Sequence, residues 1–193
     1  MGALMSVDPD PYPDWLRPPV GGYTADDLDR LPDLPPHTEL IDGGLVFVSP
    51  QAKFHIRVIL ALYGALAAAV PDGWEVWPEM TVELDGRNRP EPDLVVVDSG
   101  SDTGQEQTYF LAEDVLLAVE VVSPGSRTRD REIKPRKYAA AGIRYFWRVE
   151  NVDGRPVVYA YELDPASNHY TPTGIFHDRL KVEHPFPVEV ELV

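Results

Sequence analysis

The 193-residue sequence contains no cysteine, which excludes disulfide bonds, thiolate zinc sites and cysteine nucleophiles. Its five histidines are too scattered to suggest a histidine cluster, so any bound metal must be held mainly by oxygen atoms. The sequence also has no run of about 18 apolar residues that could span a bilayer. The N-terminus lacks the basic and apolar regions of a signal peptide, and we therefore expect a soluble cytoplasmic protein.

Positive charge is scarce, because 17 Lys and Arg residues face 32 Asp and Glu residues and the net charge is -15. This balance argues against a protein that coats nucleic acid non-specifically. The segment 127–148 is an exception with eight basic and two acidic residues, so that it carries +6 and the rest of the chain -21. Such a segment suits a polyanionic substrate, but it is also typical of a solvated helix face.

The length and the 44% hydrophobic content suit a single domain with a sizeable core. Residues 1–22 hold five prolines and few periodic apolar positions. This composition predicts an extended arm that is ordered only against a partner. We expect residues 23–193 to form one folded domain.

Residue patterning predicts a mixed α/β fold, in which helices flank a mixed sheet. Between Ala52 and Val70 the apolar residues follow one helical stripe, which predicts the first long helix. His55 lies on that stripe, so its ring should face inward, either as an ordinary core residue or as part of a site. The other predicted elements are, in chain order, a short helix from Thr24 to about Leu31, a hairpin of Glu39 to Ile41 and Leu45 to Val48, strands from Trp74 to Leu84 with a break near Pro78, a helix from Arg129 to Ala141 with Pro135 in its first turn or kinking it, strands Tyr145 to Glu150 and Pro156 to Leu163, and a weaker pair beyond Tyr170.

Two segments are apolar on both alternating faces, namely Leu94 to Val97 and Val115 to Val122. This pattern predicts central strands that are covered on two sides. The polar stretch between them, from Ser99 to Asp114, is long enough to form a mobile surface loop.

Three polar residues stand out against this apolar background. Asp93 opens the first central strand, Glu120 lies inside the second, and Lys134 follows shortly beyond. A carboxylate buried in an aliphatic strand costs several kcal/mol unless a cation or a proton neutralises it. Alternation places Glu120 on the strand face of Leu116, Ala118 and Val122. If the two strands pair, both carboxylates converge at one edge of the sheet.

Such a pair of carboxylates suits Mg²⁺, which prefers hard oxygen ligands and keeps several water molecules. One metal-bound water could act as the nucleophile, while the cation screens the charge that builds on a phosphoryl oxygen. Lys134 could position that water or stabilise the pentacovalent phosphorus.

The motifs of the chain resemble those of the Uma-type restriction endonuclease family of bacteria, which belongs to the PD-(D/E)xK nuclease superfamily. The resemblance runs from about Tyr23 to Leu163. It rests on Glu39-Leu40-Ile41-Asp42-Gly43, His55, Pro92-Asp93-Leu94-Val95-Val96, Glu120-Val121-Val122-Ser123-Pro124-Gly125-Ser126, Arg129-Asp130-Arg131-Glu132-Ile133-Lys134, and Tyr138-Ala139-Ala140-Ala141-Gly142 before Tyr145-Phe146-Trp147.

The resemblance implies a restriction-endonuclease-like core and a Mg²⁺ site, in which Mn²⁺ could substitute. Asp93, Glu120 and the backbone carbonyl of Val121 would be the metal ligands. In many superfamily members the catalytic lysine lies two residues after the strand acid, where this chain has a valine. In this family it lies on the next helix, which makes Lys134 the candidate and Lys137 a poorer one.

Two further polar positions of the family match this chain. Glu39 would be an additional acid near the metal, and His55 would support the ligands or act as an acid or base. The resemblance thus implies a catalytic set of Glu39, His55, Asp93, Glu120 and Lys134.

Three functions are compatible with these residues. The first is a Mg²⁺-dependent endonuclease that hydrolyses DNA and that would need a homodimer to cut both strands. The second is a binding or regulatory protein that has kept a nuclease fold without turnover. The third is glycoside hydrolysis by Asp93 and Glu120, but such sites usually carry aromatic sugar platforms, and the tryptophans lie elsewhere in the sequence.

Overall fold

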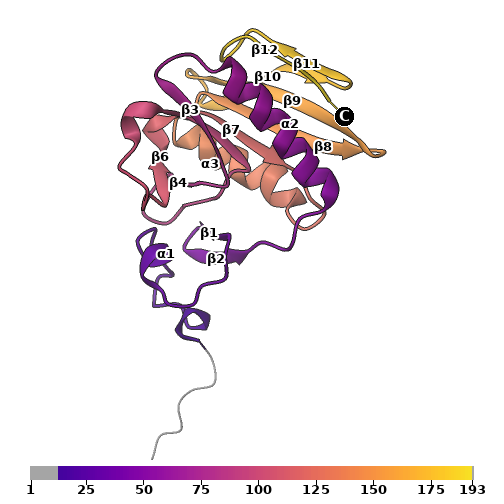
Figure 1. Cartoon of the computed structure of the whole chain (residues 1–193). Coiled ribbons are helices and arrows are strands. Elements are labelled where there is room, and N and C mark those ends of the chain that lie inside the picture. The colour runs from indigo at the N-terminus through magenta and orange to yellow at the C-terminus, as the bar shows by residue number, and fades with distance from the viewer. Residues whose placement is uncertain (1–12, 193) are drawn as a thin grey trace, which may run out of the picture.

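The computed structural model of the chain describes residues 13–192, which are built around a six-stranded mixed sheet (Figure 1). The strand order is β10-β9-β8-β7-β5-β3. Within this sheet β7 and β8 pair in parallel, and the other neighbouring strands pair antiparallel. These strands are β3 (Trp74–Pro78), β5 (Leu94–Asp98), β7 (Val115–Val121), β8 (Tyr145–Val152), β9 (Arg155–Asp164) and β10 (His169–Phe176). The predicted mixed α/β fold is confirmed.

The remaining elements lie around this sheet. The helices and helical turns are η1 (Asp14–Leu16), α1 (Asp27–Arg30), α2 (Lys53–Ala69), η2 (Ser99–Ser101), η3 (Ala112–Asp114), the π-helical turn η4 (Arg129–Ile133) and α3 (Lys134–Ala140). The remaining strands are β1 (Thr38–Ile41) with β2 (Gly44–Phe47), β4 (Thr81–Glu83) with β6 (Tyr109–Leu111), and β11 (Arg179–Val182) with β12 (Val188–Glu191). None of the helices in residues 13–192 has the length and apolar character needed to cross a membrane.

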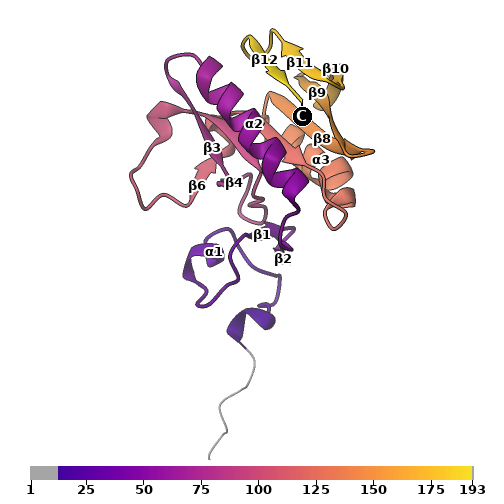
Figure 2. The same cartoon turned by 45° about the vertical axis from the view of Figure 1, so that its right-hand side comes forward.

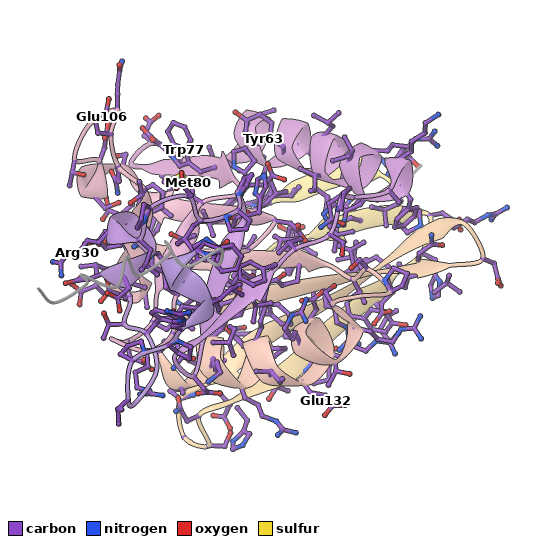
Figure 3. All side chains as sticks on the ribbon, turned by 90° about the horizontal axis from the view of Figure 1, so that it is seen from below. Arg30, Tyr63, Trp77, Met80, Glu106 and Glu132 are labelled. Carbon is purple, nitrogen blue, oxygen red and sulfur yellow. The ribbon has the colours of Figure 1, made fainter. Side chains whose placement is uncertain are left out.

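The two main helices cover opposite faces of the sheet. Viewed from below, α2 lies on one side of the sheet and α3 on the other (Figure 3). Alternation along β5 explains this arrangement, since Val96 packs in the cluster that contains α2 while Val95 packs in the cluster that contains Tyr138 of α3. Both valines are fully buried. The prediction of a central strand covered on two sides is therefore confirmed.

One detail of the predicted alternation is wrong. The register between β5 and β7 shifts, so that Val96 pairs with Leu117 and Val97 with Val115. Leu116 has no partner in this register and packs on the α2 side, away from the face that Ala118 shares with α3. A bulge of this kind reverses the alternation of the residues before it.

The segment from Ser99 to Asp114 is not the simple surface loop that its polarity predicts. It contains β6, which pairs in parallel with β4, and Phe110 is only 4% exposed in the core. The strand is three residues long, which is too short to produce a clear periodic pattern.

The hairpin β1–β2 lies below the main sheet and leads directly into α2 (Figures 1 and 2). Residues 1–12 of the predicted extended arm lie outside the described residues. The later part of that arm includes η1, where the Trp15 ring packs edge-on against Phe47 at 5.1 Å. The Tyr23 hydroxyl also donates to the Trp15 carbonyl oxygen at 2.9 Å. This part of the arm is therefore folded onto the hairpin instead of being extended.

Candidate active site

A cleft of about 1040 Å³ opens beside the sheet, where β5 begins and β7 ends. The β1–β2 hairpin, the first turn of α2, the loop after β7 and the start of α3 contribute to its wall. All six residues that the sequence singles out line this cleft, namely Glu39, His55, Asp93, Glu120, Val121 and Lys134. The structure therefore brings together positions that are up to 95 residues apart in the chain.

Asp93 is fixed by both of its carboxylate oxygens. The register pairs Leu94 with Val119, which brings Asp93, one residue earlier, close to the end of β7. The Val121 N–H donates to Asp93 Oδ2 at 2.5 Å, and His55 Nε2 lies 2.8 Å from Asp93 Oδ1. The start of one central strand is thus tied to the end of its neighbour.

His55 faces inward from the first turn of α2, as its place on the apolar stripe predicts. It is 4% exposed, and its Nδ1 atom is buried with no hydrogen-bond partner within residues 13–192. Only Nε2 is therefore engaged, and its partner is Asp93. The geometry makes His55 a residue that positions the Asp93 carboxylate.

Glu120 is held by two donors from α3. Lys134 Nζ donates to Glu120 Oε2 at 3.0 Å, and the Tyr138 hydroxyl donates to Glu120 Oε1 at 2.5 Å. The two donors are four residues apart, so they project from the same side of the helix. All three side chains are buried. Sequence reasoning missed Tyr138, although its spacing of one helical turn from Lys134 is a signal that could have found it.

Lys134 is shared among several oxygen atoms. Its Nζ lies 2.6 Å from Glu39 Oε1 and 3.7 Å from Asp130 Oδ1, in addition to its contact with Glu120. Lys137 forms an ion pair with Asp42 at 2.6 Å and does not line the cleft. Of the two lysines considered from the sequence, Lys134 is therefore the one that reaches the acids.

Asp130 is a second residue that sequence reasoning missed. It lies in the π-helical turn η4, is 2% exposed, and its Oδ1 atom is buried without a hydrogen-bond partner among the described residues. A π-helical turn inserts an extra residue into a helix, and such turns are frequent at functional sites. Pro135 lies in the first turn of α3, directly after η4, where its missing N–H is tolerated.

The cluster is short of positive charge, because Lys134 alone faces the three carboxylates of Glu39, Glu120 and Asp130. Burial raises the pKa of Glu120 well above its usual value. The Lys134 ammonium group opposes this rise, and repulsion from Asp130, Asp93 and Glu39 adds to it. Burial likewise raises the pKa of Asp130 to about 6. Burial disfavours the charged form of Lys134, but the surrounding carboxylates outweigh it and hold the pKa of the ammonium well above its usual value.

This charge deficit bears on the predicted metal site. Within residues 13–192, no three Asp, Glu or His side chains form a ready-made metal-binding group. The predicted ligand set differs from such a group, since it consists of Asp93, Glu120 and the backbone carbonyl of Val121. Hard oxygen atoms with too little neutralising charge, among them an Asp130 oxygen that accepts no hydrogen bond from the described residues, fit a hard divalent cation such as Mg²⁺. Because each oxygen of Asp93 and Glu120 already contacts a nitrogen or hydroxyl group of the protein, a cation would have to share or displace these contacts.

Several of the eight basic residues in the segment 127–148 form ion pairs with acidic residues of the protein. Arg131 and Arg148 both pair with Glu150, at 2.8 Å and 3.0 Å, and Arg144 pairs with Glu162 at 3.1 Å. These acids are buried or half-buried neighbours on β8 and β9. Much of the positive charge seen in the sequence is therefore neutralised locally and is not available to a polyanion.

A match to a known protein family establishes the family to which the chain belongs. The sequence pattern of Uma2, a family described as "Putative restriction endonuclease", matches residues 25–193. This chain belongs to the Uma2 family. The resemblance inferred from the motifs is confirmed, and the Uma2 match extends to the C-terminal hairpin β11–β12, beyond the span that the motifs cover. No curated protein sequence matches the chain significantly.

Several solved structures resemble this Uma2 chain to different degrees. A "putative nuclease belonging to DUF820" from Anabaena variabilis superposes with a TM-score of 0.66 at 16% identity, over 84% of this chain and 89% of that one. NucC from Pseudomonas aeruginosa in its cAAA-bound form matches 65% of this chain and 85% of that chain, with 11% identity and a TM-score of 0.36. NucC from Escherichia coli MS115-1 in its apo form matches 62% and 78%, with 9% identity and a TM-score of 0.37. The Anabaena likeness shows the fold alone, and the two NucC likenesses are too weak to carry an argument.

Proposed function

We propose that this Uma2 chain is a Mg²⁺-dependent endonuclease that hydrolyses phosphodiester bonds of DNA. The observation that carries the proposal is the convergence of Asp93, Glu120 and Lys134 in one cleft, at the meeting ends of two central strands. Burying three carboxylates around a single lysine carries a desolvation cost. Such a costly arrangement supports a role in function and not in stability.

The proposed ligands of Mg²⁺, or of Mn²⁺ in its place, are Asp93, Glu120 and the Val121 carbonyl. When bound there, the cation would supply a water of lowered pKa and a Lewis acid at the phosphoryl oxygen. The protein's own contribution is orientation. His55 holds the Asp93 carboxylate through Nε2, and the Tyr138 hydroxyl holds the Glu120 carboxylate.

Lys134 is proposed to act as a fixed cation. Its raised pKa keeps Nζ protonated, so the ammonium group can donate hydrogen bonds but cannot accept a proton. Glu39 Oε1 holds Nζ at 2.6 Å, which aims the ammonium group into the cleft. From that position Lys134 can orient the attacking water by hydrogen bonding, or stabilise the negative charge that develops on the phosphate.

One observation favours a second candidate, a binding or regulatory protein on the same fold. Both oxygens of Glu120 already accept hydrogen bonds from Lys134 and Tyr138. If no cation displaces these donors, the cleft has no activated water. Glycoside hydrolysis has less support, since no tryptophan is among the described residues that line the cleft.

Nicking of supercoiled plasmid DNA in Mg²⁺ tests the proposal. We expect the parent protein to nick the plasmid and Glu120→Gln to lose about 10²- to 10³-fold in rate, because the neutral amide cannot replace the carboxylate ligand. Glu132→Gln is the matched control, since Glu132 has the same charge but is exposed and projects from the outer surface in Figure 3. Nicking by Glu120→Gln at the parent rate would contradict the proposal.

A thermal-shift titration with Mg²⁺ separates the two candidates. Metal binding to the folded state should raise the melting temperature of the parent and of Glu132→Gln, but not that of Glu120→Gln. Stabilisation by metal without any nicking would favour the binding protein over the enzyme. Cutting both DNA strands would require two sites, so we also propose a homodimer, which a measurement of mass in solution would test.

A further inference from the structure

Six basic side chains among the described residues line the cleft, and four of them have an acidic partner. His37 lies 2.6 Å from Glu91 Oε1, and His55, Arg131 and Lys134 are also paired, as described above. The other two are Arg127 and Arg129, whose guanidinium groups form no hydrogen bond or ion pair with any side chain in residues 13–192. These two arginines carry the uncompensated positive charge of the cleft wall.

Arg129 is the more informative of the two. Its Nε atom is buried and has no hydrogen-bond partner within the part of the chain that the structure describes. A buried donor without an acceptor is unfavourable, and such groups are rare in folded proteins. The cleft-facing position of Arg129 therefore suggests that its acceptor belongs to a ligand and not to the protein.

The neighbouring loop does not supply acceptors to these arginines. Two of its hydroxyl residues, Ser123 and Ser126, hydrogen-bond to each other at 2.9 Å, and neither bonds to Arg127 or Arg129 among the described residues. Both arginines follow Glu120 within nine residues of chain, so a cationic wall adjoins the acidic cluster of Glu120 and Asp130. A ligand that fits both parts of the cleft needs two anionic groups. One would share a bound cation with the acidic cluster, and the other would contact the two arginines.

We infer that Arg129, with Arg127 beside it, binds a backbone phosphate of the DNA strand other than the phosphate that is cleaved. The inference rests on the proposed function and deepens it, because it requires a substrate with at least two linked phosphates. A guanidinium group suits this task, since its planar array of N–H donors matches two phosphate oxygens at once.

Binding of a fluorescein-labelled DNA duplex, followed by anisotropy over a range of salt concentrations, tests this inference. All variants carry Glu120→Gln in addition, so that the DNA is not cleaved during the measurement. We expect Arg129→Gln to weaken binding about tenfold and to reduce the slope of log affinity against log salt concentration by about 0.9, the value for one lost phosphate contact. Arg127→Gln should act in the same direction.

Two variants guard against a merely structural or global charge effect. Arg136→Gln removes the same charge from an exposed position on α3 that does not line the cleft, and it should change affinity by less than about twofold. Arg129→Lys keeps the charge but not the paired donors, so it should restore the salt slope and only part of the affinity. If Arg129→Gln does not fold, as judged by circular dichroism, Arg129→Lys and the exposed Arg127→Gln still decide the question.

The inference is overturned if Arg129→Gln and Arg127→Gln match Arg136→Gln in affinity and salt slope, or if the duplex does not bind at all. Plasmid nicking then separates this failure from a failure of the proposed function. Binding that depends on Arg129 without any nicking leaves the phosphate contact standing and rejects the enzyme. If the parent nicks the plasmid but DNA binding does not depend on Arg129, the enzyme proposal stands and the phosphate contact is rejected.

Discussion

The two helices that cover the central sheet bury different kinds of side chain. Helix α2 buries His55 at its start and otherwise only aliphatic residues, among them Leu62 and Leu66. The unit formed by η4 and α3 buries Asp130, Lys134 and Tyr138. Apolar burial stabilises a fold by about 25 cal/mol per Å², whereas burial of charges carries a desolvation cost that their mutual attraction rarely exceeds.

The buried residues of α2 contribute mainly to stability, whereas those of η4 and α3 belong to the candidate active site. The α2 face supplies the larger of the two apolar core clusters on the sheet, and only the first turn of α2 lines the cleft. The α3 face places charged and hydroxyl groups against Glu120, in the middle of the sheet. We expect substitutions on the two faces to have different consequences for stability and for activity.

Lys134→Met and Leu62→Ala offer the sharpest test of this contrast. Lys134→Met leaves three buried carboxylates without their shared cation and should lower the free energy of unfolding by about 3–5 kcal/mol. Leu62→Ala opens a cavity at a fully buried site and should cost a similar amount, about 2–5 kcal/mol. Urea unfolding measures both losses.

Activity should distinguish the two variants. Per folded molecule, Leu62→Ala should nick plasmid DNA at close to the parent rate, whereas Lys134→Met should be inactive. If both variants lost stability and activity in parallel, the two helices would not differ in the way that their buried residues suggest.

The sequence predicted the stabilising face of the molecule better than the charged one. The apolar runs of β5 and β7 and the stripe of α2 follow from periodicity alone, because burial on one or two faces leaves a direct pattern. The motifs also identified Asp93, Glu120 and Lys134, which the structure brings together in one cleft. Whether they hold a metal stays a prediction.

What the sequence did not predict depends on tertiary contacts. In the sequence Asp130 is one more charged residue of a segment that suits a solvated helix, whereas the structure buries it in the π-helical turn η4. Tyr138 lies one helical turn after Lys134, but this spacing alone does not show that its hydroxyl group meets Glu120. Leu116 was misplaced by a bulge, and β6 was missed because three residues give no period.

The pH dependence of stability should report on the charged face through Asp130. Its pKa is raised from 3.8 in an unfolded chain to about 6, mainly by burial. The carboxyl group therefore stabilises the folded state fully below about pH 4, and this stabilisation is lost as the pH rises through about 6. The linked free energy is about 3 kcal/mol.

Asp130→Asn should remove this dependence, since an amide resembles the protonated acid and does not titrate. The variant should be more stable than the parent above pH 6 by up to about 3 kcal/mol and similar to it near pH 4. Urea unfolding across this pH range measures the difference, with Glu132→Gln, exposed in the same turn, as the control. A constant difference between Asp130→Asn and parent at all pH values would show that Asp130 is not the titrating group.

The smallest of these effects concerns one hydroxyl group and compares two tyrosines on the two helices. Tyr138 is fully buried on α3 and donates to Glu120, whereas Tyr63 is 38% exposed on α2 and lies at the outer surface in Figure 3. Burial, together with the nearby Glu120 carboxylate, raises the pKa of Tyr138 well above its usual value, so it stays protonated and remains a donor. Tyr138→Phe should therefore cost about 1.5–3 kcal/mol, because Glu120 Oε1 loses its partner.

Tyr63→Phe removes the same atom from the apolar-packed helix and should change stability by less than about 0.5 kcal/mol. Nicking should separate the two variants as well, with a loss of about 10- to 100-fold for Tyr138→Phe alone, as expected for a residue that orients a metal ligand. Equal effects of the two substitutions would mean that the Tyr138 hydroxyl does not hold Glu120. The charged face would then depend on Lys134 alone for its geometry.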